Sequence, residues 1–207
     1  MPKNYSLELS EAYAHLRKDK ALRPLLDAVG HISIAPAREP SPLHSLAQSI
    51  TSQQLNGKAA AAIFSRLLEL YDGCLDAERI LETGEDDLRS VGLSRAKAAS
   101  IKDLAEKAVA GVVPGWKELR KMGDEEIVER LTQVRGIGRW TVEMLLIFSL
   151  GRPDVWPVDD FAIKRAFALY FGGAERPKRT ELIARAEGWR PWRSVVARCL
   201  WRYLDEG

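Results

Sequence analysis

The sequence is poor in the residues from which metal centres and disulfide frameworks are built. Its 207 residues include two cysteines, Cys74 and Cys199, and three histidines. No CxxC pair occurs, so a structural zinc site or an iron–sulfur cluster held by four cysteines is excluded. The count alone allows one disulfide between the two cysteines, but a reduced intracellular protein is the favoured interpretation.

Long apolar runs are also missing. No stretch approaches the roughly 20 apolar residues that a membrane-spanning helix needs. Residues 1–16 lack the apolar core of a signal peptide. We therefore expect a cytoplasmic protein with no membrane contact. The formal net charge is only +2, which by itself does not indicate a nucleic-acid partner.

The period-two alternation of apolar and polar residues that is typical of half-buried strands is absent, and apolar residues recur at helical spacing instead. Residues 31–42 contain three prolines and read as an ordered connector, in which a short strand over residues 31–34 would have no partner. The sequence therefore predicts an all-α fold. The expected helices cover residues 8–18, 21–29, 43–55, 58–71, 76–81, 84–90, 94–110, 124–131, 140–150, 160–171, 178–187 and 191–204. Ser94 is expected to be the N-cap of the helix that runs to about residue 110.

A tight turn is predicted at residues 134–141, VRGIGRWT, between two helical patterns. Two glycines flanking one apolar residue allow positive φ angles, and Ile137 can fill the space between the helices. Because Gly136 and Gly138 have no Cβ atom, a phosphate could approach the backbone amides at the start of the next helix. Such a turn binds the DNA backbone without reading its sequence, although an ordinary helix–helix turn is the alternative.

A pair of adjacent aspartates, Asp159 and Asp160, lies 22 residues after Gly138, counted to the second of the pair. An aspartate just before an amphipathic helix is a preferred N-cap, so capping is the favoured role of either residue taken alone. Two adjacent aspartates are more than one cap requires, so one of the two carboxylates is a candidate functional group.

The last predicted helix carries a tryptophan away from its apolar face. At about 100° per residue, one face holds Trp192, Val195, Val196, Cys199 and Tyr203, and we expect this face to join the core. Trp201 would point about 180° away from Trp192, beside Ser194, Ala197 and Arg198. A large aromatic side chain off the core face needs another partner.

These motifs together resemble the helix-hairpin-helix (HhH-GPD) DNA glycosylase superfamily, over roughly residues 40–207. The turn resembles its hairpin pattern L-x-G-[IV]-G-x-x-T-A, and ITSQQLN at residues 50–56 resembles its I-x-x-Q-Q segment. DDFAIKRAF at 159–167 and WRPWRSVVARCLW at 189–201 are most similar to the bacterial 3-methyladenine DNA glycosylase II type. The sequence departs from the pattern at Arg135, where the family usually has proline, and at Met144, where some relatives have tyrosine.

The resemblance implies that Asp160, the second acid of the pair, is the catalytic residue. An ungapped match to the endonuclease III branch gives Asp159 instead, so Asp159 remains as the alternative or as a cap or orienting neighbour. A carboxylate stabilises the oxocarbenium character that builds on the sugar as the base leaves, and it can orient or deprotonate water. An alkylated purine is a cationic leaving group, so no dedicated general acid is needed.

The resemblance also implies roles for further residues. A flipped base would meet aromatic or apolar side chains, and the gap in the duplex would be filled by a wedge. Arg95 and Lys97 are interpreted as structural or as contacts to the DNA backbone. No cofactor is required, but the hairpin carbonyls are expected to hold Na⁺ or K⁺. The implied sets are Trp201, Trp140, Phe161 and Met144 for the base pocket, Gln54 or Leu55 for the wedge, Arg135, Gly136, Gly138 and Arg139 for the backbone, and the carbonyls of Thr132, Val134 and Ile137 for the ion.

A tryptophan at one position decides the subclass. Bifunctional members of the superfamily carry a lysine just past the hairpin, which attacks the sugar and leads to strand cleavage. This chain has Trp140 after Gly138 and Arg139, and it lacks the four cysteines of the endonuclease III branch. We therefore expect a monofunctional glycosylase with water as nucleophile. The alternatives are a glycosylase/lyase that uses another lysine and a non-catalytic DNA-binding protein.

The expected architecture is one glycosylase unit over residues 1–207 with two helical lobes and a cleft between them. One lobe covers about 40–150, including the helix-hairpin-helix at 124–150, and the other covers about 1–39 and 151–207. The expected partner is damaged double-stranded DNA, bound by a monomer. Purines alkylated at N3 or N7 are the favoured substrates, and deaminated or etheno bases remain open.

Overall fold

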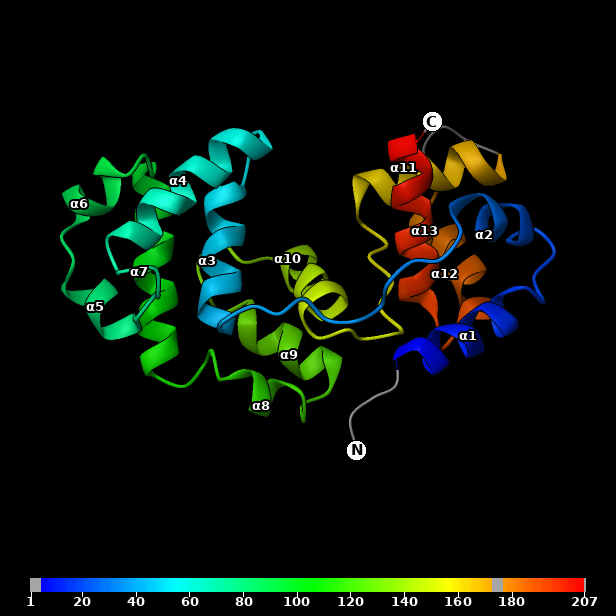
Figure 1. Ribbon diagram of the computed structural model, residues 1–207, viewed down its shortest axis with the longest axis horizontal. Helices are drawn as coiled ribbons and strands as arrows, with labels where there is room; N and C mark the ends of the chain where they lie inside the picture. Colours follow the sequence, from blue (N-terminus) through cyan, green and yellow to red (C-terminus); the bar gives the residue numbers. More distant parts are fainter. Residues whose placement is uncertain (1–4, 173–176, 207) are drawn as a thin grey trace. The chain divides into compact units, whose positions relative to one another are not determined.

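The computed structural model describes residues 5–172 and 177–206. Within these two ranges every regular element is a helix, so the predicted all-α class is confirmed (Figure 1). The chain divides into two compact units. We call Arg38–Leu145 the central unit, and Met1–Ala37 together with Leu146–Gly207 the terminal unit. None of the described helices combines the length and apolar content that crossing a membrane requires.

The central unit is organised around its longest helix, α7. This helix packs against α3, α5 and α6, and Ala98, Ile101 and Leu104 are fully buried at its three-residue spacing. One long helix therefore packs against three other helices of this unit. The helices of this unit are α3 (Pro42–Ser52), α4 (Gly57–Glu69), α5 (Ala77–Glu82), α6 (Glu85–Ser90), α7 (Arg95–Val109), α8 (Trp116–Leu119), α9 (Asp124–Leu131) and α10 (Arg139–Met144).

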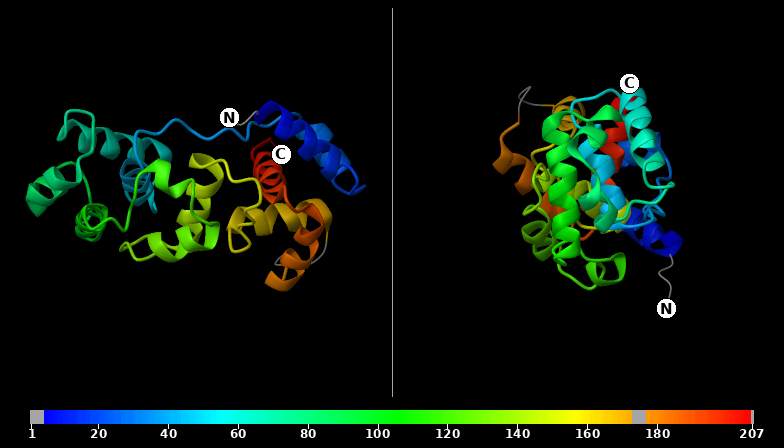
Figure 2. Two further views of the ribbon diagram at one scale, coloured as in Figure 1. Left: turned by 90° about the horizontal axis from the view of Figure 1, so that it is seen from below. Right: turned by 90° about the vertical axis from the view of Figure 1, so that its left-hand side faces the viewer.

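The terminal unit joins the two ends of the chain around α13. This helix contacts α11 and α2, and Figure 2 shows the blue N-terminal helices close to α13 in red. Leu26, Ile163, Trp189 and Val196 are buried in one core, so segments far apart in sequence fold together. The helices of this unit are α1 (Tyr5–Leu16), α2 (Arg23–Val29), α11 (Phe161–Phe171), α12 (Arg179–Ala186), a 3₁₀ turn (Glu187–Trp189) and α13 (Arg193–Glu206).

Polar side chains cap the N-termini of several helices. Ser41, Asn56 and Ser94 each accept a hydrogen bond from the amide three residues later, at 3.1, 2.9 and 3.3 Å respectively. Each bond satisfies one of the first amides of a helix, which have no partner within the helix itself. The predicted cap at Ser94 is therefore confirmed.

The predicted helix over residues 140–150 is wrong in its second half. The α-helix α10 ends at Met144, and Leu145–Ser149 continues as a π-helix. Apolar periodicity does not separate these two states, because the run of apolar residues is continuous through both. The four-residue helix α8 was also not expected, and the connector at residues 31–34 forms no strand.

The apolar face of the last helix joins the core, as expected. The other side of the helix is buried as well: Ser194 is 2% exposed and Ala197 is fully buried, although the sequence placed both beside Trp201, away from the apolar face. These side chains are small, so other parts of the unit can approach α13 closely on that side as well. Trp201 packs against the same core as the apolar face.

Candidate functional site

Asp160 occupies the N-cap of α11 and is 8% exposed. Its Oδ1 atom accepts a hydrogen bond from the amide of Ile163 at 2.7 Å, as the capping interpretation requires. The same atom accepts a second bond from Nε1 of Trp201 at 3.0 Å. The two candidates that the sequence placed 41 residues apart therefore touch, and the bond fixes the orientation of the carboxylate.

Asp159 has a different environment from its neighbour. Its carboxylate is exposed and pairs with Lys164 at 3.2 Å and Arg179 at 3.4 Å. Burial raises the pKa of Asp159, but the hydrogen bonds from Lys164 and Arg179 outweigh this effect and hold the pKa below its ordinary value. Asp159 does not cap the helix, because Asp160 does, so the expectation of Asp159 as the cap is wrong.

Trp201 is part of an aromatic and cationic group within the terminal unit. Its ring stacks on Phe148 with 5.6 Å between centroids and 28° between planes. The guanidinium of Arg198 lies 4.9 Å from the centre of the Phe148 ring, and burial lowers the pKa of Arg198. The cation therefore holds Phe148, which in turn supports Trp201.

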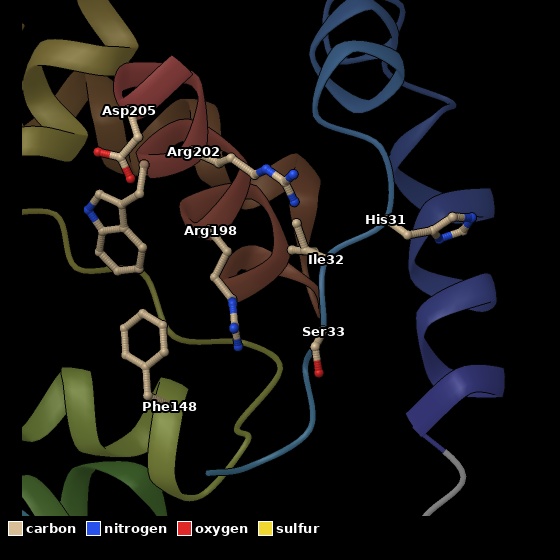
Figure 3. A pocket seen from close by; sticks show the side chains of 8 residues that line it. His31, Ile32, Ser33, Phe148, Arg198, Arg202 and Asp205 are labelled. Atoms are coloured by element: carbon tan, nitrogen blue, oxygen red, sulfur yellow. The ribbon is translucent and has the colours of Figure 1, made fainter. Parts of the chain in front are cut away.

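An open cavity of about 520 Å³ adjoins this group. Figure 3 shows Phe148, Arg198 and Arg202 on one side, and Ile32 and Ser33 on the other. The cavity's lining is His31, Ile32, Ser33, Phe148, Arg198, Trp201, Arg202 and Asp205. Among the predicted pocket residues of this unit, Trp201 lines the cavity and Phe161 does not. The side chain of Phe161 is 77% exposed at the first position of α11.

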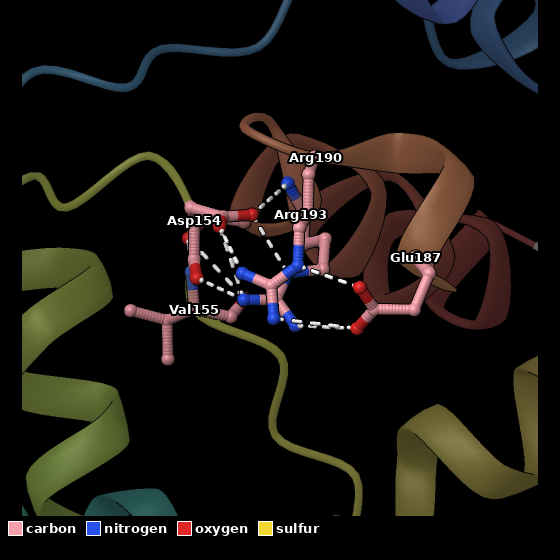
Figure 4. A network of polar contacts seen from close by, with 6 residues as sticks. Asp154, Val155, Glu187, Arg190 and Arg193 are labelled. Atoms are coloured by element: carbon pink, nitrogen blue, oxygen red, sulfur yellow. Dashed lines mark hydrogen bonds and ion pairs between the residues drawn. The ribbon is translucent and has the colours of Figure 1, made fainter. Parts of the chain in front are cut away.

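A polar network fixes the loop that leads to Asp160. Arg193 donates to Asp154 at 2.7 and 3.0 Å, and Arg190 donates to the same carboxylate at 2.7 Å (Figure 4). The hydroxyl of Ser194 accepts a bond from the amide of Val155 at 2.9 Å. These contacts attach the loop to the start of α13, the helix that carries Trp201, so they maintain the bond between Trp201 and Asp160.

In the central unit, the chain between α9 and α10 forms the predicted tight turn. The amide of Ile137 donates to the carbonyl of Val134 at 3.0 Å, and the Ile137 side chain is buried between the helices. Gly136 has φ +80° and requires glycine. Gly138 has φ −98°, so only the first of the two glycines uses the positive φ that glycine allows. A Cβ atom on Gly138 would meet nothing within 4 Å, so its backbone is open to an approaching group.

The two arginines of the turn differ in their contacts. The backbone amide of Arg135 donates to Asp103 at 2.7 Å, and the side chain is exposed. Arg139 donates two bonds to Glu125, at 3.0 and 2.6 Å. These bonds hold the pKa of Glu125 below its usual range. Arg139 would therefore exchange an exposed carboxylate partner for a phosphate if it bound DNA, whereas Arg135 extends directly into solvent.

The predicted wedge residues lie in the loop between α3 and α4. Gln54 adopts a left-handed conformation with φ 57°, which is uncommon for a residue other than glycine. Leu55 is 40% exposed. The preceding residue, Gln53, donates from Nε2 to the carbonyl of Gly136 at 2.8 Å. The loop is thus bonded to the hairpin, a link between residues 83 positions apart that no local sequence pattern indicates.

Four further candidates lie in the same unit. Trp140 is 49% exposed, and Met144 is half-buried on the same short helix. Lys97, interpreted as structural or as a phosphate contact, directs Nζ to two backbone carbonyls of the protein. Arg95 is exposed and lies 3.4 Å from Glu85.

The chain is similar to known proteins along most of its length. A model of the HhH-GPD superfamily of base excision DNA repair proteins matches residues 47–192. DNA-3-methyladenine glycosylase 1 of Schizosaccharomyces pombe is 36% identical over 198 residues, which cover 94% of this chain and 87% of that protein.

Solved structures give the same result. The 3-methyladenine DNA glycosylase of the same yeast, in complex with abasic DNA, matches with TM-score 0.81 over 93% of this chain and 95% of that chain, at 36% identity. A DNA-3-methyladenine glycosidase from Bacillus halodurans matches with TM-score 0.83 over 93% and 88%, at 32% identity. The resemblance inferred from the motifs is confirmed, and the chain belongs to the HhH-GPD superfamily of base excision DNA repair proteins.

Proposed function

We propose that the chain is a monofunctional DNA glycosylase that removes alkylated purines, of the 3-methyladenine and 7-methylguanine type, from double-stranded DNA in base excision repair. It acts as a monomer on DNA in the cytoplasm. The observation that carries this proposal is the bond from Trp201 to Asp160 at 3.0 Å, in a chain similar to proteins named DNA-3-methyladenine glycosylase.

Asp160 is the catalytic residue in this proposal. Two donors hold its Oδ1 atom, so the carboxylate is oriented before the substrate arrives. It stabilises the positive charge that develops on the sugar as the glycosidic bond breaks, and it orients the water that attacks C1′. Asp159 is a poorer candidate because Lys164 and Arg179 already compensate its charge.

The aromatic residues favour a cationic base. Trp201 and Phe148 form a stacked pair, and aromatic faces attract positively charged rings more strongly than neutral ones. An alkylated purine carries such a charge and is also a good leaving group. Trp140, Met144 and Phe161 are proposed to complete the contacts to the flipped base.

The hairpin is proposed to hold the DNA backbone through Arg135, Gly136, Gly138 and Arg139. The carbonyl oxygens of Thr132, Val134 and Ile137 are donors of the type that Na⁺ and K⁺ accept, and such an ion would add positive charge next to a phosphate. The amides of Gly136 and Gly138 have no acceptor within the described residues, which supports a phosphate contact. No cofactor takes part in the reaction.

Mass spectrometry of bases released from methylated duplex DNA tests the function. We expect 3-methyladenine and 7-methylguanine in the supernatant and an abasic but uncleaved strand. Trapping with borohydride should give no covalent adduct, because Trp140 stands where a lyase would have its lysine. An adduct would establish the lyase alternative. Duplex binding with no base release would establish the non-catalytic one.

A further inference from the structure

One face of α7 contacts both loops that the proposed function assigns to DNA. Lys97, Ser100 and Asp103 are spaced three residues apart, so they lie along the same side of the helix. Lys97 contacts the end of α3, where the wedge loop begins, and the other two contact the hairpin. The two loops are more than 80 residues apart in sequence, as the 83-residue separation of Gln53 and Gly136 shows.

Lys97 closes the C-terminus of α3. Its Nζ atom donates to the carbonyls of Thr51 and Gln53, both at 2.7 Å. Carbonyls in the last turn of a helix have no donor within the helix, and a lysine ammonium supplies up to three. Burial lowers the pKa of Lys97. The two bonds fix the backbone directly before Gln54, whose left-handed conformation then turns the chain toward Leu55.

Asp103 and Ser100 hold the hairpin from the same helix. The carboxylate of Asp103 accepts the amide of Arg135 at 2.7 Å. The hydroxyl of Ser100 lies so close to Gly136 that a Cβ atom there would be 3.0 Å from it. The hairpin therefore rests on α7 with no room for a side chain at Gly136.

Gln53 connects the two loops directly. Its backbone carbonyl accepts from Lys97, while its side chain donates to the carbonyl of Gly136 at 2.8 Å. Lys97, Gln53 and Gly136 thus form a continuous chain of bonds from α7 through the wedge loop to the hairpin. A shift of Lys97 would move the wedge loop relative to the hairpin.

We propose that Lys97 is a positioning residue for base extrusion, which holds the wedge loop at residues 53–56 at a fixed distance from the phosphate-binding hairpin. The proposal rests on the proposed function. A wedge is needed to displace a base that is stacked and paired, and much less to capture one that is already unpaired. The contribution of Lys97 must therefore depend on the pairing of the damaged base, whereas a purely structural contribution would not.

Single-turnover rates on two duplexes test this dependence. Both carry 7-methylguanine, opposite cytosine in one and opposite a tetrahydrofuran abasic analogue in the other. Lys97→Met should slow release from the paired duplex by about 10- to 100-fold, because small displacements of positioning groups have effects of this size. Release from the unpaired duplex should fall by less than about threefold, since little extrusion remains to be done. Lys97→Arg should keep most of the wild-type ratio because it keeps the charge and the donors.

Lys102 provides the matched control on the same helix. Its Nζ atom donates to the carbonyl of Leu81 at 2.8 Å and to that of Thr83, at the end of α5. Lys102→Met removes the same kind of helix closure away from the two loops. It should change thermal stability but leave the ratio of paired to unpaired rates at its wild-type value.

The possible outcomes separate the two proposals. Equal slowing on both duplexes by Lys97→Met, or no slowing, overturns the positioning role while leaving the glycosylase function intact. If wild-type protein releases no base from either duplex, the proposed function fails. In that case base extrusion is measured by the fluorescence of 2-aminopurine placed beside the lesion, which rises when the neighbouring base is unstacked. This fluorescence should be lower with Lys97→Met than with the wild-type protein. If that variant does not fold, Gln53→Ala removes only the side-chain link to Gly136 and should give the same pairing-dependent loss; an unchanged ratio in it overturns the proposal.

Discussion

The central and terminal units present their candidate functional groups in different ways. In the central unit, the hairpin and wedge loop are held mainly by bonds to the backbone, as in the contacts of Lys97 and Gln53 to carbonyls and of Asp103 to an amide. In the terminal unit, Asp160 and Trp201 contact each other through their side chains. The first arrangement fixes the path of the chain, and the second fixes the orientation of one carboxylate.

This difference matches the two tasks of the proposed reaction. A DNA backbone has the same chemistry at every step, so a correctly shaped main chain is sufficient to bind it. Breaking one glycosidic bond requires a charge at one point. Substitutions in the hairpin and wedge loop of the central unit should therefore alter DNA binding or base extrusion. Substitutions at Asp160 and Trp201 should alter the rate of glycosidic bond cleavage.

The largest effect that this comparison predicts belongs to Asp160→Asn. Asparagine keeps an oxygen that can accept from Ile163 and Trp201, so the cap and the fold should persist. It removes the negative charge, and base release from methylated DNA should fall by about 10²- to 10⁴-fold. Duplex affinity, measured by fluorescence anisotropy, should remain close to wild type.

Asp159→Asn is the matched control for this variant. It removes an adjacent carboxylate that pairs with Lys164 and Arg179 on an exposed surface. Because such pairs contribute little, release should stay within about threefold of wild type. If Asp159→Asn lost the activity and Asp160→Asn kept it, the catalytic assignment would move to Asp159.

A smaller effect is expected for Trp201→Phe. Phenylalanine keeps an aromatic ring against Phe148 but removes the Nε1 donor to Asp160. The carboxylate becomes less well oriented, and the single-turnover rate should fall by about 10- to 100-fold, since a hydrogen bond to a charged group contributes about 1.5–3 kcal/mol. Time courses of base release, quenched at intervals with enzyme in excess over DNA, measure this single-turnover rate. An unchanged rate would mean that Trp201 acts only as an aromatic surface.

The sequence predicted the motifs of both units better than their contacts. The helical class, the hairpin and the Ser94 cap could be predicted because glycine spacing, capping residues and helical periodicity are local signals. The bond between Asp160 and Trp201 joins two elements 41 residues apart, so only the folded chain reveals it. Phe148 was missed for the same reason, since it belongs to an apolar run whose π-helical turn no local pattern indicates.

The two glycines of the hairpin can each be replaced by alanine, which adds one methyl group and changes no charge or hydrogen-bonding group of the central unit. Gly136→Ala places a Cβ atom 3.0 Å from the Ser100 hydroxyl at φ +80°, and should destabilise the protein by about 1–3 kcal/mol. Gly138→Ala meets nothing within 4 Å at φ −98° and should leave thermal stability near wild type. Both should weaken duplex binding in anisotropy titrations, because each adds a methyl group where a phosphate is proposed to approach. If Gly138→Ala bound DNA with wild-type affinity, the proposed phosphate contact at Gly138 would be wrong.

The smallest effect concerns stability and the side-chain contacts of the terminal unit. Asp19 accepts bonds from Nε1 of Trp189 at 3.0 Å and from the amide of Ala21 at 3.0 Å, and Arg185 lies 2.5 Å away. Burial raises the pKa of Asp19, but these bonds outweigh it and the pKa lies below its ordinary value.

A carboxylate with a lowered pKa in the folded state stabilises the protein above the pKa it has when unfolded, near 3.9. This stabilisation is lost as the pH falls through the lower, folded pKa. Asp19→Asn should therefore lower the Tm by about 5 °C at pH 7, with the difference from wild type shrinking below about pH 4. Thermal melts followed by circular dichroism between pH 3 and pH 7 measure it. A Tm difference that does not change with pH would show that the contacts of Asp19 depend on its shape and not on its charge, which would make this part of the terminal unit resemble the backbone-held loops of the central one.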